Sequence, residues 1–220
     1  MPKDSGIGAS SKRREDIRFL TGAGNYTDDI NVYGQAYVHF LRSDVAHGRI
    51  VSIDTDAAAA MPGVVRVFTG ADFAAVGGLP CGWQVTDRFG QPMQEPAHPV
   101  LAQGKVRHVG DPIAAVVAES PEQARDAAEA ISVEIEELPA VVDMKAALST
   151  DAPKVHDDLT SNLCYDWGFV EENKDAVAAA FEKAAHVTTL ELVNQRLVAN
   201  PMEPRVAVGD YSRATDESTL

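Results

Sequence analysis

The chain has little cysteine. Its 220 residues include only Cys81 and Cys164, which lie far apart and form no C-x-x-C pattern. This scarcity argues against a disulfide framework and against a Cys-ligated iron–sulfur site. There is also no run of 18 apolar residues, and Met1–Asp4 lacks the apolar stretch of a signal peptide. We therefore expect a cytoplasmic protein without a membrane span.

Positive charge is scarce as well, with 19 Lys and Arg against 33 Asp and Glu and a net charge of −14. A field of this sign repels phosphate backbones, so we expect no nucleic-acid partner. The only basic cluster is Lys12-Arg13-Arg14. A solvated arm is the favoured interpretation of this cluster, and a phosphate-binding patch is the alternative.

Common catalytic motifs are missing too. The sequence contains no G-x-x-x-x-G-K-[ST], so it has no P-loop for phosphate binding, and it contains no H-E-x-x-H metal-binding motif. Gly6-Ile7-Gly8 is not a dinucleotide-binding fingerprint, because no strand precedes it. Flexibility of the arm is the simpler interpretation of these glycines. The six histidines are scattered. His98 and His108 could meet as metal ligands, although surface or core positions are commoner for such residues.

Two further groups have the residue types of catalysis without its usual setting. Ser43, Asp44 and His47 share one short loop but lack a nucleophile elbow, so a turn held by Asp44 is the simpler interpretation. The carboxylates at positions 134, 136 and 137 could serve in acid–base chemistry. Those at 134 and 136 share one strand face, which is typical of a solvated surface.

Periodicity predicts an α+β domain over residues 20–140. Residues 34–42 alternate an apolar set, Ala36, Val38 and Phe40, with Tyr37, His39 and Leu41, which predicts a half-buried strand. Further strands are predicted at 50–53, 64–68, 105–109 and 133–136, and a strand covered on both faces at 112–118.

Helix signals are clear at two places. Asp56 is predicted to cap a short helix over 57–61 that Pro62-Gly63 ends. Ser120, Pro121 and Gln123 form the pattern of a capping box at the start of a helix that should run to about Ile131.

The remaining segments are less regular. Residues 77–103 predict a long loop that is functional, disordered or held by a partner. After a linker rich in Pro and Asp, we expect a helix over 175–185 and strands over 186–198 and 205–211. Ser218-Thr219-Leu220 would begin a returning strand, which indicates a second domain that is incomplete.

One segment in this second part has a distinctive backbone. Pro201 and Pro204 fix the chain around Glu203 and Arg205. An ion pair at the start of a strand is the favoured interpretation. A direct catalytic role is the alternative.

Four segments together resemble one known family. They are Lys12–Gly22 with Tyr26–Ile30, His108–Ala118, Val133–Asp143, and Leu192–Arg196 with Asn200–Arg205. In this order they are similar to the start of the large, molybdenum-carrying subunit of the xanthine dehydrogenase, aldehyde oxidase and carbon monoxide dehydrogenase family.

The resemblance implies an extended N-terminal arm (1–18), an α/β hammerhead domain (19–140), a linker (141–164) and an incomplete molybdopterin-binding domain (165–220). It implies a molybdopterin-dependent oxidoreductase that oxidises an aldehyde, an N-heterocycle or carbon monoxide, with water as the oxygen source. The family's catalytic glutamate, molybdenum-proximal glutamine and cofactor loop lie further along such subunits. No catalytic, cofactor-binding or metal-binding residue is therefore transferred, and Pro201, Glu203 and Arg205 are expected only to shape the approach to the site.

The resemblance also implies cofactors and partners. The full-length protein would carry molybdopterin cytosine dinucleotide. FAD and iron–sulfur clusters would lie on partner subunits, and the remainder of the large subunit would complete the site. The 220 residues alone are then expected to be structural and inactive. The alternative is a stand-alone hammerhead module that docks onto the flavin and iron–sulfur subunits without catalysis.

Overall fold

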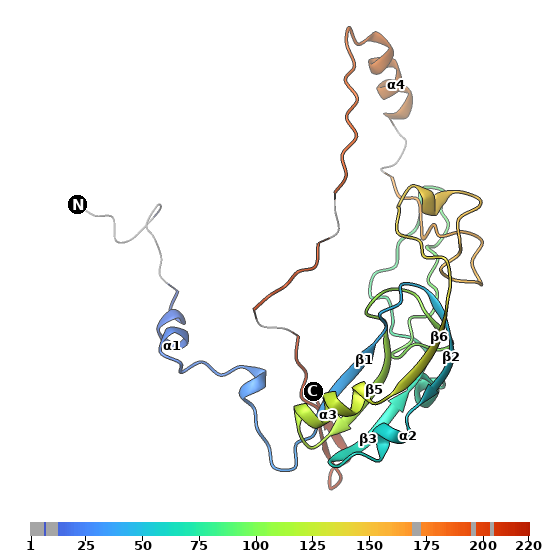
Figure 1. Ribbon diagram of the computed structural model, residues 1–220. Helices are drawn as coiled ribbons and strands as arrows, with labels where there is room; N and C mark the ends of the chain where they lie inside the picture. The colour runs from blue at the N-terminus through green and yellow to red at the C-terminus, as the bar shows by residue number, and fades with distance from the viewer. Residues whose placement is uncertain (1–6, 8–12, 169–172, 195–196, 203–204) are drawn as a thin grey trace. The chain divides into compact units, whose positions relative to one another are not determined.

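The computed structural model describes residues 7, 13–168, 173–194, 197–202 and 205–220 (Figure 1). The chain divides into two compact units. The central unit is Ala36–Thr189, and the terminal unit combines Met1–Gln35 with Leu190–Leu220. Within the described part of the chain, no helix is long and apolar enough to cross a membrane.

The first sheet of the central unit has the order β1-β5-β3, and all its strands are antiparallel. It comprises β1 (Tyr37–Arg42), β5 (Pro112–Ala118) and β3 (Val64–Thr69). The central strand β5 has five buried residues out of seven, which confirms the prediction from its continuous apolar sequence.

The second sheet has the order β4-β2-β6 and is also antiparallel. Its strands are β4 (Lys105–Val106), β2 (Gly48–Asp54) and β6 (Ser132–Glu137). The strand predicted over 105–109 is therefore shorter than expected. Its continuation turns away because the Arg107 amide donates to Asp111 Oδ2 at 2.9 Å, which closes a turn over residues 107–111.

Helix α3 (Pro121–Glu129) begins as the sequence predicts, since Ser120 Oγ accepts a hydrogen bond from the Gln123 amide at 3.2 Å. It ends two residues before Ile131. The second half of the predicted capping box is replaced by another contact. The Gln123 side chain lies against Gly63, whose φ of +80° and lack of a Cβ make room for it.

Helix α2 (Asp56–Ala59) differs from the prediction at its start. Thr55 occupies the N-cap position, and Asp56 lies in the first turn. The Asp56 amide is satisfied by Asp54 Oδ1 at 3.0 Å. The predicted cap at Asp56 is therefore wrong, because an earlier carboxylate takes that role.

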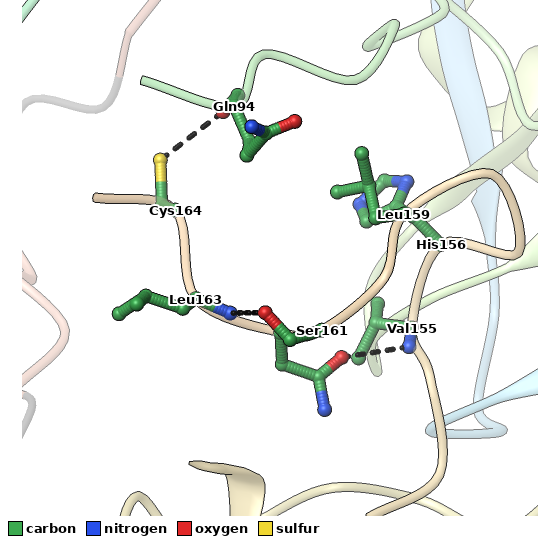
Figure 2. Close-up of a pocket in the computed structure, with 8 residues that line it drawn as sticks. Gln94, Val155, His156, Leu159, Ser161, Leu163 and Cys164 are labelled. Carbon is green, nitrogen blue, oxygen red and sulfur yellow. Dashed lines mark hydrogen bonds between the residues drawn. The ribbon is translucent and has the colours of Figure 1, made fainter. Parts of the chain in front are cut away.

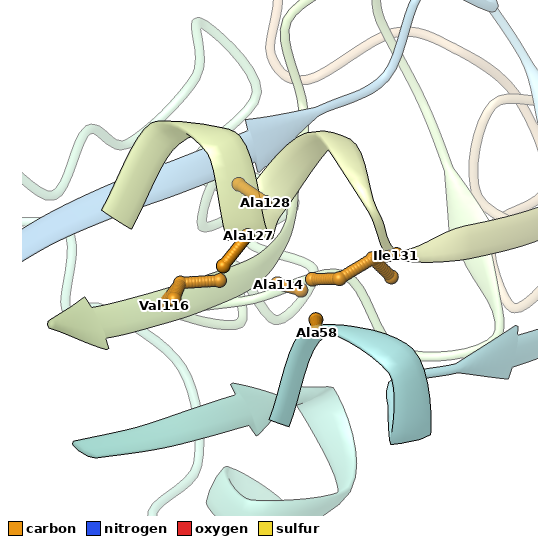
Figure 3. Close-up of a cluster of buried hydrophobic side chains, with 6 residues drawn as sticks. All are labelled: Ala58, Ala114, Val116, Ala127, Ala128 and Ile131. Carbon is orange, nitrogen blue, oxygen red and sulfur yellow. The ribbon is translucent and has the colours of Figure 1, made fainter. Parts of the chain in front are cut away.

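The main core lies where α3 and α2 pack on β5 (Figure 3). Small side chains dominate this contact, so the helix backbone can approach the sheet closely. The buried members of this cluster are Ala58, Ala114, Val116, Ala127, Ala128 and Ile131.

The buried face of β1 is the opposite of the one its hydrophobicity indicates. Tyr37, His39 and Leu41 are half-buried, whereas Val38 is 54% exposed and Phe40 41% exposed. Leu41 packs against the core cluster that α3 covers, and this contact decides which face is turned inward. The apolar set predicted from alternation is thus the exposed one.

The segments outside the two sheets are sparsely structured. They contain α1 (Asp16–Leu20), α4 (Lys174–Lys183), a β7 (Asp210–Ser212) and β8 (Glu217–Thr219) hairpin, and short 3-10 turns at Thr27–Asp29, Gly70–Phe73 and Ala146–Leu148. Residues 16–18 of the predicted extended arm are therefore helical.

Two predicted strands are wrong in whole or in part. The described residues of 186–198 form no strand, although their alternation favours one. An extended segment becomes a strand only when a neighbour accepts its backbone hydrogen bonds, and no described strand does so here. Of the strand predicted over 205–211, only Asp210 and Tyr211 pair, with Thr219 and Ser218.

We predict that Val116→Ala lowers the free energy of unfolding by about 2 kcal/mol, because it removes two methyl groups from a filled interior. Val116 is fully buried, whereas Val65 on β3 is 63% exposed. Val65→Ala is the matched control and should change stability by about 0.5 kcal/mol or less. Urea unfolding of both variants measures the difference, and equal losses would contradict the assigned core.

Candidate functional site

The long loop predicted at 77–103 is held by a later segment of the same unit. Within the loop only two isolated bridges form, Gly78 with Pro99 and Thr86 with Pro92. Residues 155–168, which we call the strap, run against it. The Gln94 amide donates to the Cys164 carbonyl and the Arg88 amide to the Asp166 carbonyl, each at 2.8 Å. These two backbone bonds join the segments in place of a regular sheet.

A pocket of about 230 Å³ lies between this loop and the strap (Figure 2). Gln94 comes from the loop, and all the other lining residues come from the strap: Val155, His156, Leu159, Ser161, Asn162, Leu163 and Cys164. Asn162 shapes the strap from within. Its Oδ1 accepts from the Val155 amide at 3.0 Å, and its Nδ2 donates to the carbonyls of Ala147 and Pro153 at 3.1 and 2.9 Å.

An ion pair joins the strap to the second sheet. Lys105 Nζ lies 2.7 and 2.6 Å from the two carboxylate oxygens of Asp157. The hydrogen bond from Lys105 is the main reason that the pKa of Asp157 falls below its ordinary value. Arg49, the neighbour of Lys105 on β2, pairs in turn with Glu136 on β6 at 3.0 Å.

Beside this pair lies a group of cationic and imidazole side chains. Burial and the nearby Arg107 guanidinium lower the pKa of His156. His47 is 5% exposed, and its Nδ1 lies 2.9 Å from the Pro139 carbonyl oxygen. Because a carbonyl oxygen only accepts, Nδ1 must carry the proton. Among the described residues, neither His47 Nε2 nor Arg107 Nε has a hydrogen-bond partner.

The loop that carries Ser43, Asp44 and His47 does not form a catalytic arrangement. Ser43 Oγ accepts from the Val45 amide at 3.1 Å and donates to the Val45 carbonyl at 2.8 Å, while His47 is engaged with Pro139. The prediction that Asp44 holds this turn is wrong. Ser43 is buried and holds it, whereas Asp44 is exposed.

The other predicted metal and acid–base candidates are dispersed. His98 and His108 are both exposed, and His108 lies 3.8 Å from Asp111 within its own turn. In the described ranges, no group of three or more His, Cys, Asp or Glu side chains is placed to hold a metal ion. Both cysteines are free and exposed.

The carboxylates considered for acid–base chemistry lie at the surface, and so do those residues of the basic cluster that the structure describes. The carboxylates at positions 134, 136 and 137 of β6 and its end are all exposed, in agreement with a solvated face. Arg13 pairs with Asp16 at 3.6 Å within the predicted arm. Lys12 and the two glycines of Gly6-Ile7-Gly8 lie outside the described residues.

The predicted site-shaping segment is described only in part. Pro201 and Arg205 are exposed. Glu203 lies outside the described residues, so its ion pair with Arg205 stays a prediction. We assign no catalytic step to Pro201 or Arg205.

Comparison with known proteins identifies the fold. Residues 21–139 match the family described as aldehyde oxidase and xanthine dehydrogenase, a/b hammerhead domain. The chain belongs to this family. The hammerhead fold expected from the sequence is thereby confirmed.

Three relatives show how far the similarity reaches. Quinoline 2-oxidoreductase from Pseudomonas putida 86 superposes with a TM-score of 0.82 at 40% identity, over 96% of this chain and 26% of that one. The nicotine 6-hydroxylase large subunit of Paenarthrobacter nicotinovorans is 36% identical over 97% of this chain and 25% of its own length. The carbon monoxide dehydrogenase large chain of Afipia carboxidovorans is 34% identical over 99% and 27%. The chain thus spans about a quarter of the length of these relatives.

Sequence reasoning missed the polar group formed by Lys105, Arg107, His156 and Asp157. These residues were assigned to a short strand and to a linker. The only available signal was the length of the 77–103 loop, which predicts that something holds it.

We predict that Ser43→Ala lowers the free energy of unfolding by about 1–2 kcal/mol, because it leaves the half-buried Val45 amide without its acceptor. Asp44→Ala, one residue away and exposed, is the control and should stay within about 0.5 kcal/mol of the parent. Thermal or urea unfolding measures both. A larger loss for the Asp44 variant would restore the interpretation that the sequence favoured.

Proposed function

We propose that this chain is the N-terminal portion of the large subunit of a molybdenum hydroxylase. In the complete protein it supplies the hammerhead domain and the first segments of the molybdopterin-binding domain. The complete enzyme oxidises an aldehyde, an N-heterocycle or carbon monoxide and takes the added oxygen from water. By itself the chain is a structural element without activity.

The observation that carries this proposal is the collinear match to long relatives. Almost the whole chain, 96–99%, aligns with a stretch of only 25–27% of the relatives' lengths. The names of the relatives include a xanthine dehydrogenase molybdenum-binding subunit and a nicotinate dehydrogenase large molybdopterin subunit. A chain of this size thus corresponds to one part of such a subunit.

The cofactor and partner assignments rest on the same resemblance. We propose molybdopterin cytosine dinucleotide as the cofactor of the complete protein, with FAD and iron–sulfur clusters on partner subunits. Such a centre would supply the oxygen transfer and accept the electrons. The contribution of this chain would be positional, with Pro201, Glu203 and Arg205 near the approach to the site. The domain limits expected from the sequence belong to the same proposal.

A molybdenum determination tests whether the chain holds the cofactor. We expect the 220-residue chain, expressed in a host that makes molybdenum cofactors and purified by gel filtration, to contain far less than stoichiometric metal. The reason is that the chain corresponds to only about a quarter of the length of such a subunit. The positive control is the Cu,Mo carbon monoxide dehydrogenase treated in the same way. Stoichiometric molybdenum on the isolated chain would show that it is not merely structural.

A second candidate function is a stand-alone hammerhead module that docks onto flavin and iron–sulfur subunits. The exposed apolar side chains of β1, Val38 and Phe40, favour this possibility because a partner surface would bury them. Co-purification of the chain with such subunits, in the absence of any longer large subunit, would support docking. If those subunits associate only when a longer large subunit is present, the stand-alone module is ruled out.

A further inference from the structure

The strap, residues 155–168, is tied to the central unit at two separate places. One tie is at the end of the second sheet, and the other is on the long loop. Residues 105 and 157 are 52 positions apart, and residues 88 and 166 are 78 positions apart. Contacts between such distant positions fix where the strap lies on the rest of the unit.

The first tie is the Lys105–Asp157 ion pair. The Lys105 side chain is only 15% exposed, while that of Asp157 is 72% exposed. Strap residue Asp157 thus covers a largely buried lysine side chain, and within the described chain no second carboxylate pairs with that lysine. Arg107 and Arg49 add to the positive potential that keeps Asp157 ionised.

The second tie combines backbone and side-chain contacts. The Arg88 amide donates to the Asp166 carbonyl at 2.8 Å, and Arg88 Nη2 lies 2.6 Å from Asp166 Oδ1. Gly168 lies against the same guanidinium, since a Cβ there would be 3.4 Å from Arg88 Cζ. Cys164 completes this tie through its carbonyl and thiol, which bond the amide and carbonyl of Gln94.

His156 lies next to the first tie and faces charges of both signs. The guanidinium of Arg107 and the ring of His47 lie near it, together with the carboxylates of Asp157 and Asp158. Arg107 Nε and His47 Nε2 have no hydrogen-bond partner among the described residues. A protonated His156 would add a positive charge beside the Arg107 guanidinium.

We propose that residues 155–168 act as a strap latched by the Lys105–Asp157 and Arg88–Asp166 ion pairs, and that acidification releases this strap at His156. Release would separate the walls of the pocket between Gln94 and the strap. The device depends only on contacts within the central unit. It therefore operates whether or not the complete protein carries a molybdenum cofactor.

The sign of the pH effect follows from the direction of the shift. The pKa of His156 is lowered when the strap is docked, so docking favours the neutral imidazole. This contribution is complete above the ordinary histidine pKa of about 6.5 and is lost as the pH falls through the lowered value. The pKa of Asp157 is lowered as well, so its carboxylate is still charged when His156 titrates.

Hydrogen exchange of the whole 220-residue chain, read by mass spectrometry, tests the latch. The reporter amides are those of Arg88 and Gln94, which are bonded to strap carbonyls. Protection is compared at about pH 7.5 and about pH 5.5 after correction for intrinsic exchange, because these values bracket the histidine pKa. At the higher pH, Asp157→Asn and Lys105→Met should each reduce protection about two- to fivefold, the range expected for an ion pair whose carboxylate is exposed to solvent.

Asp158→Asn removes the same charge one residue away and should leave protection unchanged. The parent chain should lose reporter protection at the lower pH, and His156→Gln should abolish that loss, whereas His186→Gln at an exposed position should not. Amides of β5 and α3 serve as the reference for global unfolding. Equal behaviour of the Asp157 and Asp158 variants, or an unchanged pH response in His156→Gln, would overturn the proposal.

Discussion

The close contact between helix α3 and strand β5 is the constraint on which the central unit depends. Ala127 and Ala128 of the helix meet Ala114 and Val116 of the strand, and all four are almost fully buried. Interiors are packed at crystal-like density, so a larger side chain at any of these positions would push helix and sheet apart at a cost of about 1–3 kcal/mol. The tight connection through Ser120 fixes the start of the helix and therefore its register on the strand.

The rest of the unit follows from that contact. With one face of β5 sealed by α3, the strands β1 and β3 pair on its two edges. Ile53 of β2 and Val133 of β6 pack against both buried clusters, so the second sheet is joined to the first through shared apolar side chains. The second sheet in turn presents Lys105 to the strap. The position of Lys105 on the second sheet, and with it the contact to the strap, therefore depends on the packing of the alanine-rich core.

Short sequence patterns were sufficient to predict two kinds of element: those stabilised by contacts between near neighbours in sequence, and strands that are buried on both faces. The N-cap at Ser120 and the continuous apolar strand at 112–118 were predictable from short stretches of sequence, whereas the hammerhead fold was expected from the family resemblance of four segments taken together. The inward face of β1 was not predictable in this way. It is decided by the packing of Leu41 against the core cluster, and the alternation of hydrophobic residues along the strand does not show that contact. The strap was not predictable either. Its ties join residues 52 and 78 positions apart, and spacing along the chain carries no information about such pairs.

The hydrogen-bond partners of the buried polar side chains indicate whether these side chains stabilise the fold or are available for catalysis. Among the described residues, the buried polar side chains are Ser43, His47 and Asp111. Each bonds to backbone atoms: Ser43 to Val45, His47 to Pro139 and Asp111 to Arg107. Groups occupied in this way hold turns and strand ends and are not free to bind substrate or transfer protons. The exceptions among the described residues are His47 Nε2 and Arg107 Nε, and both side chains lie near His156 of the strap. An unsatisfied polar atom in a low-dielectric setting is sensitive to a nearby change of charge. Among the described residues, these two unsatisfied side-chain atoms therefore lie beside the imidazole whose protonation we propose to release the strap.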